Sequence, residues 1–219
     1  MNPIFIGTGF YSSAEDHPRK LDFFKTWLLN NPSFPTVVID NSALGLGPEP
    51  SFAAYGADLR IIRVRKNLGH MSAPLVPSRL LGGTLSWILP ALVAYSENCD
   101  YIYKEQDCLA FGNWIPEVRQ GRASFGNHAT MDCEQSLVYI ARDFIPDFLA
   151  AYMAIPESDA QVLGETKYKL IEAQFPGQIA RHALQPGRGR PLPLDFRGPW
   201  TAQQFTAAEL AALKAAGWV

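Results

Sequence analysis

The sequence predicts an α/β fold: a doubly wound, mostly parallel sheet flanked by helices. Three observations predict it. Short apolar or β-branched runs alternate with longer segments of helical spacing in the first half of the chain. Polar side chains follow each of the four strands predicted there, and ligands of such sheets bind off the carboxyl ends of the strands. The 17 glycines and 17 prolines indicate many turns, which are atypical of a helical bundle.

The elements of the first half follow as strand, helix, strand, strand, helix and strand. A helix that begins near Pro18 has leucine and phenylalanine side chains at helical spacing and ends before Asn30-Asn31-Pro32. The run Thr36–Asp40 is apolar and β-branched, which suits a central parallel strand covered on both faces. The other strands are expected at Pro3–Gly7, which leads into a Gly-Thr-Gly turn, at Leu59–Val64 and at 101–104.

The apolar run Leu80–Tyr95 is expected to form a buried helix, at about residues 78–97. It is shorter than the ~20 residues that cross a bilayer, and it contains Gly82, Gly83 and Pro90. We therefore predict no transmembrane segment, while a peripheral association with a membrane stays open.

The second half is less regular. A strand is expected at Ala123–Asn127, and the apolar segment Leu137–Met153 is split at Pro146, with a helix at about 146–154. Further helices are expected at Gly164–Phe175 and at Ala207–Ala216. The last one follows Thr206 and has Glu209 at its third position, which is a capping box. A basic loop is predicted between these two helices, from Arg181 to Pro191.

Composition restricts the class of protein. The 219 residues suit one domain. A net charge of −2 gives no general attraction to nucleic acid. Cys99, Cys108 and Cys133 form no CxxC pair, which fits reduced thiols. Because the N-terminus also lacks the pattern of a secretory signal, we expect a cytoplasmic protein.

Two carboxylates, Glu105 and Asp107, follow the strand that contains Tyr101–Tyr103. Residues two apart on a strand point to the same side, so both carboxylates are expected to face one site. Two carboxylates at such a short separation repel each other unless a cation lies between them or one of them takes a proton. Mg²⁺ or Mn²⁺ with oxygen ligands would explain the pair. The alternative is two solvated carboxylates in a loop.

The order of these pieces resembles the nucleotide-sugar glycosyltransferases of the A-type (GT-A) fold. The pieces are Asp40-Asn-Ser, Arg65-Lys-Asn67-Leu-Gly69, a buried helix and Glu105-Gln-Asp107, within about residues 1–112. The resemblance implies transfer of a sugar from a UDP- or GDP-linked donor to a glycan, lipid or protein acceptor, assisted by Mn²⁺ or Mg²⁺. The resemblance also implies a nucleotide-binding half at about 1–112 and an acceptor half, with the basic loop and the last helix, at about 113–219. A bacterial surface polysaccharide pathway is a further expectation from the family. Glu105 departs from the family's Asp-x-Asp and leaves the need for metal open.

The resemblance also implies roles for particular residues. Asp107 and Glu105 would bind the metal, with His182 as a further ligand. The donor would contact Thr8, Gly9, Phe10, Asp40, Arg65, Asn67 and Glu105, and the guanidinium groups of Arg188 and Arg190 would close over its diphosphate. The family's catalytic base is a carboxylate at a helix start. Glu165 and Asp159 are the candidates, since Thr166 stands where the family's second carboxylate would be.

Each of these residues also has a structural interpretation. Asp40 is equally suited to cap its own turn, and the glycines of Gly-Thr-Gly to form a turn. The arginines would then be solvated surface residues, His182 a hydrogen-bonded structural residue and Glu165 a first-turn residue favoured by the helix dipole. Trp114 and Trp200 would either stack on a sugar ring or belong to the core.

Two other functions remain open. A sugar nucleotidyltransferase would have a glycine-rich basic loop after the first strand, but residues 7–13 contain no Arg or Lys, which argues against it. A catalytically inactive nucleotide-binding protein on the same fold is the second alternative.

Overall fold

The computed structural model describes residues 2–31, 34–46, 58–64, 82–126, 134–155, 164–184, 198–203 and 205–219. The strands are β1 (Ile4–Phe10), β2 (Thr36–Asp40), β3 (Leu59–Arg63), β4 (Asp100–Lys104), β5 (Cys108–Phe111), β6 (Ala123–Gly126), β7 (Glu134–Ile140), β8 (Ile179–His182) and β9 (Trp200–Gln203). The helices are α1 (His17–Leu29), α2 (Gly82–Ser96), α3 (Ile115–Val118), α4 (Ile145–Ala154), α5 (Gly164–Gln174) and α6 (Ala207–Ala215), with a 3₁₀ turn at Arg142–Phe144.

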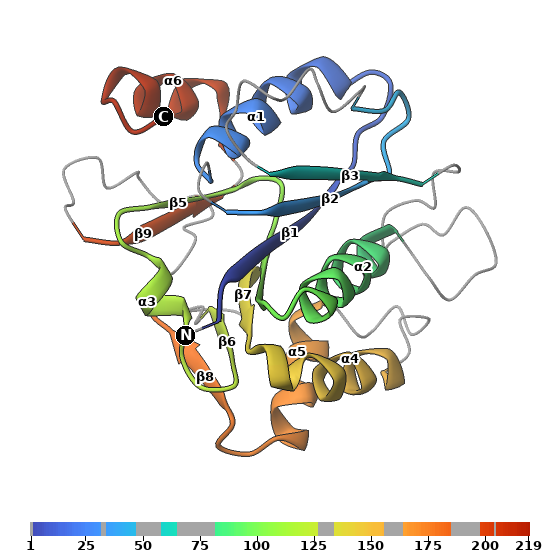
Figure 1. The fold of residues 1–219 in the computed structure, drawn as a ribbon. Coiled ribbons are helices and arrows are strands. Elements are labelled where there is room, and N and C mark those ends of the chain that lie inside the picture. The colour runs from blue at the N-terminus through green and yellow to red at the C-terminus, as the bar shows by residue number, and fades with distance from the viewer. Residues whose placement is uncertain are drawn as a thin grey trace.

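A seven-stranded sheet in the order β3-β2-β1-β4-β7-β6-β8 forms the centre of the molecule (Figure 1). Strands β3, β2, β1 and β4 are parallel, and β8 is parallel to β6. Strand β7 runs antiparallel to both β4 and β6. The mostly parallel α/β class predicted from the sequence is therefore confirmed. A separate two-stranded sheet pairs β5 with β9, and the sequence did not predict it.

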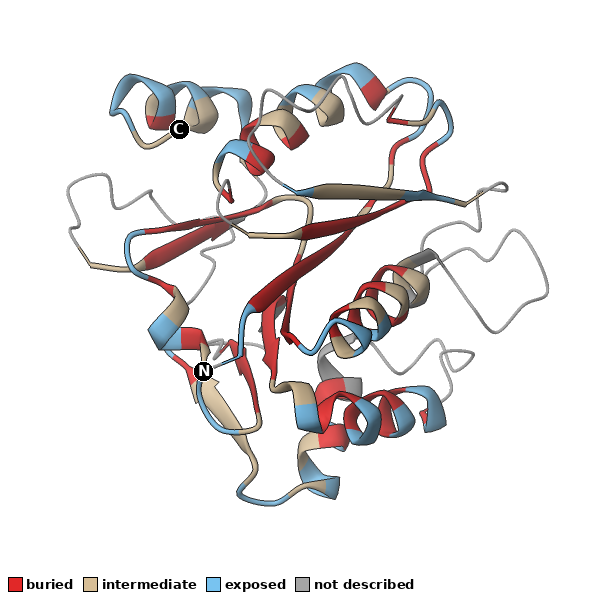
Figure 2. Cartoon of the chain, viewed as in Figure 1, coloured by how far each residue is buried: buried red, intermediate tan, exposed pale blue. Residues whose placement is uncertain are grey.

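Each face of the central sheet has its own hydrophobic core. Helices α2, α4 and α5 cover one face around Trp87, which contacts five other aromatic side chains. Helices α1, α3 and α6 and the β5–β9 sheet cover the other face around Trp27. All residues of β2 and β4 are buried, which is why both strands are recognisable as apolar runs (Figure 2).

The first strand is longer than expected, and this corrects the position of Thr8, Gly9 and Phe10. These residues do not form a turn but continue β1, where they are in register with β2. A Cβ atom on Gly9 would lie 2.0 Å from Ser86 Oγ of α2, and one on Gly7 would lie 2.4 Å from Pro90 Cβ. The two glycines therefore allow α2 to pack directly on the backbone of β1.

We expect Gly9→Ala to lower the free energy of unfolding by about 1–3 kcal/mol, because the added methyl group overpacks the β1–α2 contact. Urea denaturation followed by circular dichroism would measure the loss. Adding Ser86→Gly removes the side chain that the methyl group meets. Gly9→Ala should therefore cost less in a Ser86→Gly background than alone, and equal costs in both backgrounds would contradict this account.

In the second half of the chain, the structure confirms some of the predicted elements and corrects one. The capping box of α6 is present: Thr206 Oγ1 accepts from Glu209 N, and the Glu209 carboxylate accepts from Thr206 N. Arg181 and His182, expected in a basic loop, belong instead to β8, which pairs with β6. The Arg181 guanidinium forms an ion pair with Glu172 of α5. The remainder of that loop, from residue 185 onward, lies outside the described residues.

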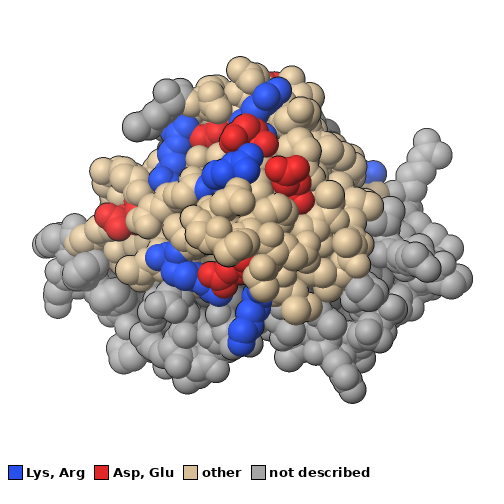
Figure 3. Space-filling model, turned by 90° about the horizontal axis from the view of Figure 1, so that it is seen from below, with Lys and Arg blue, Asp and Glu red and all other residues tan. Residues whose placement is uncertain are grey.

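Within the described ranges, no helix is both long and apolar enough to cross a bilayer. Figure 3 shows the molecule from below the orientation of Figure 1, with acidic and basic side chains interspersed over the described surface. Several such groups pair, as Arg122 does with Asp143 at 3.2 Å. The described part of this face therefore offers no single-sign surface for a polyanion.

Candidate functional site

The carboxyl ends of β1 and β4 form the candidate site. From β1 the chain continues to its neighbour β2 on one side, whereas β3 is followed by α2 and then by β4 on the other side of β1. The strand order thus reverses between β1 and β4, and open α/β sheets bind ligands in the crevice at such a switch point. Tyr11 follows β1 there, and Glu105 follows β4.

Glu105, Gln106 and Asp107 form a tight turn between β4 and β5, which we call the acid turn. The Cys108 amide donates to the Glu105 carbonyl at 3.0 Å and closes the turn. The alternation of a strand therefore does not apply here, because β4 ends at Lys104 and these three residues form a turn. Burial raises the pKa of Tyr103 well above its ordinary value, and the charges of Glu105 and Asp107 add to the shift. Both carboxylates thus act on the same buried hydroxyl group.

Side chains from α1 and from the turn itself fix the position of the acid turn. The Trp27 indole Nε1 donates to the Glu105 carbonyl oxygen at 2.8 Å. The Gln106 amide pairs with the backbone of Tyr11: Oε1 accepts from its N–H at 2.8 Å, and Nε2 donates to its carbonyl at 3.4 Å. Gln106 therefore joins the segments that follow β1 and β4 at the switch point. No motif in the sequence pointed to Gln106 or to Trp27.

Lys104, the last residue of β4, is completely buried next to the acid turn. Its Nζ donates to the Oδ1 atoms of Asn30 and Asn31 at 2.6 and 2.9 Å and lies over the rings of Trp27 and Trp114. Burial lowers the pKa of Lys104 to about 7. One signal in the sequence could have identified Lys104: it is a lysine at the end of an otherwise apolar strand.

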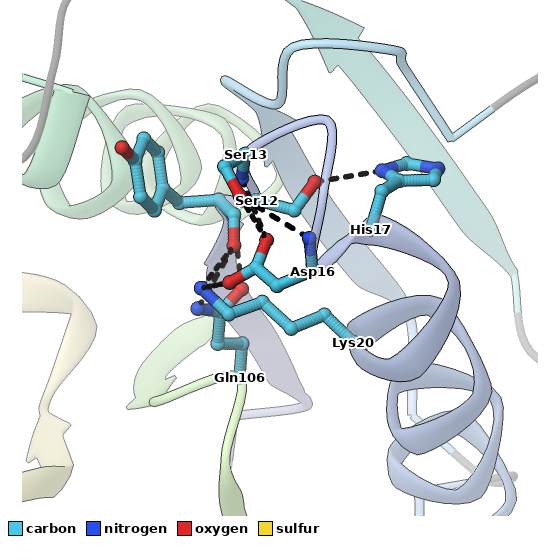
Figure 4. A network of polar contacts seen from close by, with 7 residues as sticks. Ser12, Ser13, Asp16, His17, Lys20 and Gln106 are labelled. Carbon is cyan, nitrogen blue, oxygen red and sulfur yellow. Dashed lines mark hydrogen bonds and ion pairs between the residues drawn. The ribbon is translucent and has the colours of Figure 1, made fainter.

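The loop between β1 and α1 is held by a network of side chains (Figure 4). The Ser13 N–H and hydroxyl donate to Asp16 at 2.7 and 2.9 Å, and Lys20 pairs with Asp16 at 3.0 Å. Ser12 Oγ lies 2.7 Å from Nδ1 of the buried His17. These contacts hold the backbone of this loop at the edge of the site.

Asp40 ends β2 at the same edge, but its carboxylate is buried and engaged within the protein. It accepts from the amide and hydroxyl of Ser42, from the Leu46 amide at 2.9 Å and from Arg63 Nη1 at 3.0 Å. This geometry matches the alternative interpretation, a carboxylate that caps its own turn. A donor nucleoside would have to compete with these four donors.

Of the other residues predicted to contact the donor, the structure describes those of β1. Thr8 and Phe10 are buried inside β1, and the Phe10 ring packs on Phe24 with centroids 5.1 Å apart. Their expected contacts with a base were through the backbone, which pairs with β2 in this region. Arg65, Asn67, Arg188, Arg190 and the candidate base Asp159 lie outside the described residues. Glu165 lies at the start of α5, where its side chain is not described.

His182 and the two tryptophans occupy the interior. His182 is fully buried with Nε2 2.9 Å from the Leu137 carbonyl oxygen, and burial lowers its pKa. This is the structural interpretation that the sequence left open, and metal binding by His182 stays a prediction. Trp114 lies over Lys104, and Trp200 stacks on Phe111 with centroids 4.3 Å apart, so both belong to the core.

The acid turn supplies two carboxylates of the kind that Mg²⁺ and Mn²⁺ prefer. The described residues contain no group of three or more His, Cys, Asp or Glu side chains that could hold a metal. Mg²⁺ in phosphate-binding sites is commonly held by one or two carboxylates, with phosphate oxygens and water completing its shell. The donor set of Glu105 and Asp107 therefore fits a metal that arrives with a diphosphate.

A cavity of about 610 Å³ lies beside the acid turn, between α1 and α6. Gln106 and Asp107 border it on the side of the turn. Its other lining residues are Arg19, Lys20, Asp22, Phe23, Phe205, Thr206, Ala207, Leu210, Ala211 and Lys214. No pattern in the sequence indicated that the last helix contributes to the surroundings of Asp107.

We expect Gln106→Leu to weaken metal-dependent nucleotide binding by about 10–100-fold, the cost of losing a group that orients a metal ligand. The substitution removes the link between the acid turn and Tyr11 while keeping both carboxylates. Calorimetric titration with UDP or GDP and Mn²⁺ would measure the effect. Gln120→Leu, which removes a glutamine bonded to the Glu117 carbonyl, is the matched control. Equal affinities in the two variants would contradict a positioning role.

No family model and no curated protein matches the chain. Among solved structures, it is similar to the glycosyltransferase GlyE from Streptococcus pneumoniae TIGR4, with 8% identity and a TM-score of 0.48 over 83% of this chain and 45% of GlyE. The galactosyltransferase LgtC, in complex with donor and acceptor sugar analogues, has 11% identity and a TM-score of 0.47 over 81% of this chain and 72% of LgtC. For S. aureus TarS the identity is 10% and the TM-score 0.49, over 84% of this chain and 35% of TarS.

The chain thus spans less than half the length of GlyE and of TarS. GlyE is a glycosyltransferase and LgtC a galactosyltransferase. At these identities and TM-scores, we carry over no donor, acceptor or residue role, so the proposal below rests on this chain's own residues.

Proposed function

We propose that the protein is a glycosyltransferase that uses a nucleotide-diphosphate sugar, UDP- or GDP-linked, with help from Mn²⁺ or Mg²⁺. The observation that carries the proposal is the acid turn at the switch point of the sheet. Glu105 and Asp107 follow the central parallel strand β4 there, next to the fixed loop after β1. A divalent cation held by these two carboxylates would also bind a diphosphate at this edge of the sheet.

Glycosyl transfer breaks the bond between the anomeric carbon of the sugar and the diphosphate. Negative charge develops on the leaving group, and a metal ion bound there would stabilise that charge. In this proposal Asp107 and Glu105 hold the ion, while Gln106 and Trp27 fix the turn that carries them. The candidates for a catalytic base remain Glu165 and Asp159, and those for closure over the diphosphate remain Arg188 and Arg190.

Binding and turnover would test the proposal separately. Calorimetric titration with UDP and GDP, with and without Mn²⁺, should show binding that the metal strengthens. Release of nucleoside diphosphate from a panel of sugar donors should follow, first by hydrolysis and then faster with an acceptor. Metal-dependent binding without turnover of any donor would indicate an inactive nucleotide-binding protein, and release of pyrophosphate from a nucleoside triphosphate would indicate a nucleotidyltransferase. No binding of either nucleotide would overturn the proposal.

A further inference from the structure

The cavity between α1 and α6 has an apolar wall. Phe23 of α1 and Phe205, just before α6, stack with their centroids 5.6 Å apart. Ala207, Leu210 and Ala211 extend the wall along α6. A volume of about 610 Å³ lies within the range of ligand sites, roughly 300–1,000 Å³. A hydrocarbon chain that lies along this wall would bury apolar surface, which favours its binding.

Cationic side chains flank this wall. Arg19 and Lys214, from opposite helices, line the cavity, and neither forms an ion pair with another described residue. Lys20 also lines it but is paired with Asp16. Asp22 and Asp107 are the acidic members of the lining, and the charge of Asp107 would be offset by a bound divalent ion. The cavity then carries a net positive charge, which complements an anion.

The cationic end of α1 adjoins the acid turn. Lys20 Nζ and Gln106 Nε2 both donate to the same atom, the Tyr11 carbonyl oxygen, at 3.1 and 3.4 Å. Arg19 is the neighbour of Lys20 in α1, whereas Phe23 lies one helical turn further along. A ligand in the cavity would therefore place its anionic group beside Asp107 and its apolar part along Phe23 and Phe205. No residue of β2 lines the cavity, so its occupant is separate from a nucleoside over β1 and β2.

We propose that this cavity binds the acceptor, and that the acceptor is an amphipathic phosphate: a hydrocarbon chain bearing a phosphate group. The inference rests on the glycosyltransferase function proposed above. An acceptor phosphate oxygen would form the new bond to the anomeric carbon as the bond from that carbon to the donor diphosphate breaks, and the nucleoside diphosphate would leave with the metal. A phosphate monoester is largely ionised at neutral pH, so no base has to remove a proton.

The test is direct binding of decyl phosphate below its aggregation concentration, measured by calorimetry with Mg²⁺ present and without nucleotide. We expect decyl phosphate to bind at least tenfold more tightly than butyl phosphate and than the uncharged decyl maltoside. Equal affinity for the decyl and butyl compounds would overturn the apolar part of the proposal. Equal affinity for decyl phosphate and decyl maltoside would overturn the phosphate part.

Two pairs of variants locate the site. Ala211→Trp fills the cavity from an exposed position of α6 and should weaken decyl phosphate binding at least tenfold, whereas Ala208→Trp, on the same helix but outside the lining, should not. Arg19→Gln should weaken decyl phosphate binding severalfold, whereas Lys25→Gln, elsewhere on α1, should not. Equal affinities within both pairs would show that the detergent-like ligand binds elsewhere and would overturn the proposal.

These measurements are independent of the test of the proposed function. Decyl phosphate binding at this cavity without any binding of UDP or GDP would refute the glycosyltransferase, and with it the acceptor role of the cavity. Metal-dependent nucleotide binding without binding of decyl phosphate would leave the glycosyltransferase and overturn the acceptor inference alone.

Discussion

Asp107→Asn should abolish metal-dependent nucleotide binding while leaving the fold intact. The substitution keeps the shape of the side chain and removes the charge that we expect a divalent ion to require. Loss of a group that only orients a metal ligand costs about 10–100-fold in affinity, so loss of a ligand itself should cost at least as much. Titration with UDP or GDP in the presence of Mn²⁺ would measure the loss, and titration without metal should show little difference from the wild-type protein.

Asp147→Asn is the matched control, because it makes the same change at an exposed position of α4, away from the acid turn. Its nucleotide affinity should equal that of the wild-type protein. Circular dichroism and the thermal midpoint of both variants would show whether the fold is retained. Unchanged affinity in Asp107→Asn, with metal present, would remove the metal site from the acid turn.

The second large effect concerns stability and pH. Burial lowers the pKa of Lys104 from its ordinary 10.5 to about 7, so the unfolded chain binds this proton more tightly than the native protein does. The free energy of unfolding should therefore rise with pH between about 7 and 10.5. From pH 7 to pH 9 this group alone should add about 2 kcal/mol, at a slope of up to about 1.4 kcal/mol per pH unit. Below pH 7 its contribution should be constant.

Lys104→Met tests this account, since methionine has a similar length and no charge. Urea denaturation at a series of pH values should show a rise in unfolding free energy for the wild-type protein that exceeds the rise for Lys104→Met. Other groups titrate in both proteins, so the difference between the two curves isolates Lys104. Lys214→Met, at an exposed lysine, should keep the wild-type curve. Parallel curves for wild type and Lys104→Met would contradict the lowered pKa.

Much of the nucleotide-binding half was predictable from local patterns. Strand β2 has the predicted bounds, because four consecutive β-branched residues followed by a carboxylate, in a strand buried on both faces, leave a continuous signal in the sequence. The capping box of α6 was equally visible, since it depends on two residues three positions apart. The end of β4 just before Glu105 was also located correctly, because the run that forms this strand is a local pattern too.

Elements that depend on distant partners were not predictable. Strands β5 and β9 are only four residues each, and they pair across roughly ninety positions of sequence. The extension of β1 through Gly9 was missed because a glycine suggests a turn, whereas here it leaves room for Ser86 of α2. Burial of His182 likewise follows from the packing of β8 on β6, which local periodicity does not report.

For the candidate site, the sequence by itself determined which functional groups are present: two carboxylates after an apolar strand. Only the tertiary structure decided that they share a turn, that Trp27 and Gln106 hold that turn and that α6 borders a cavity next to Asp107. The physical reason is the range of the interactions. Apolar periodicity and capping act within a few residues, whereas the bonds that fix the acid turn join groups 78 and 95 positions apart and exist only once the sheet has formed.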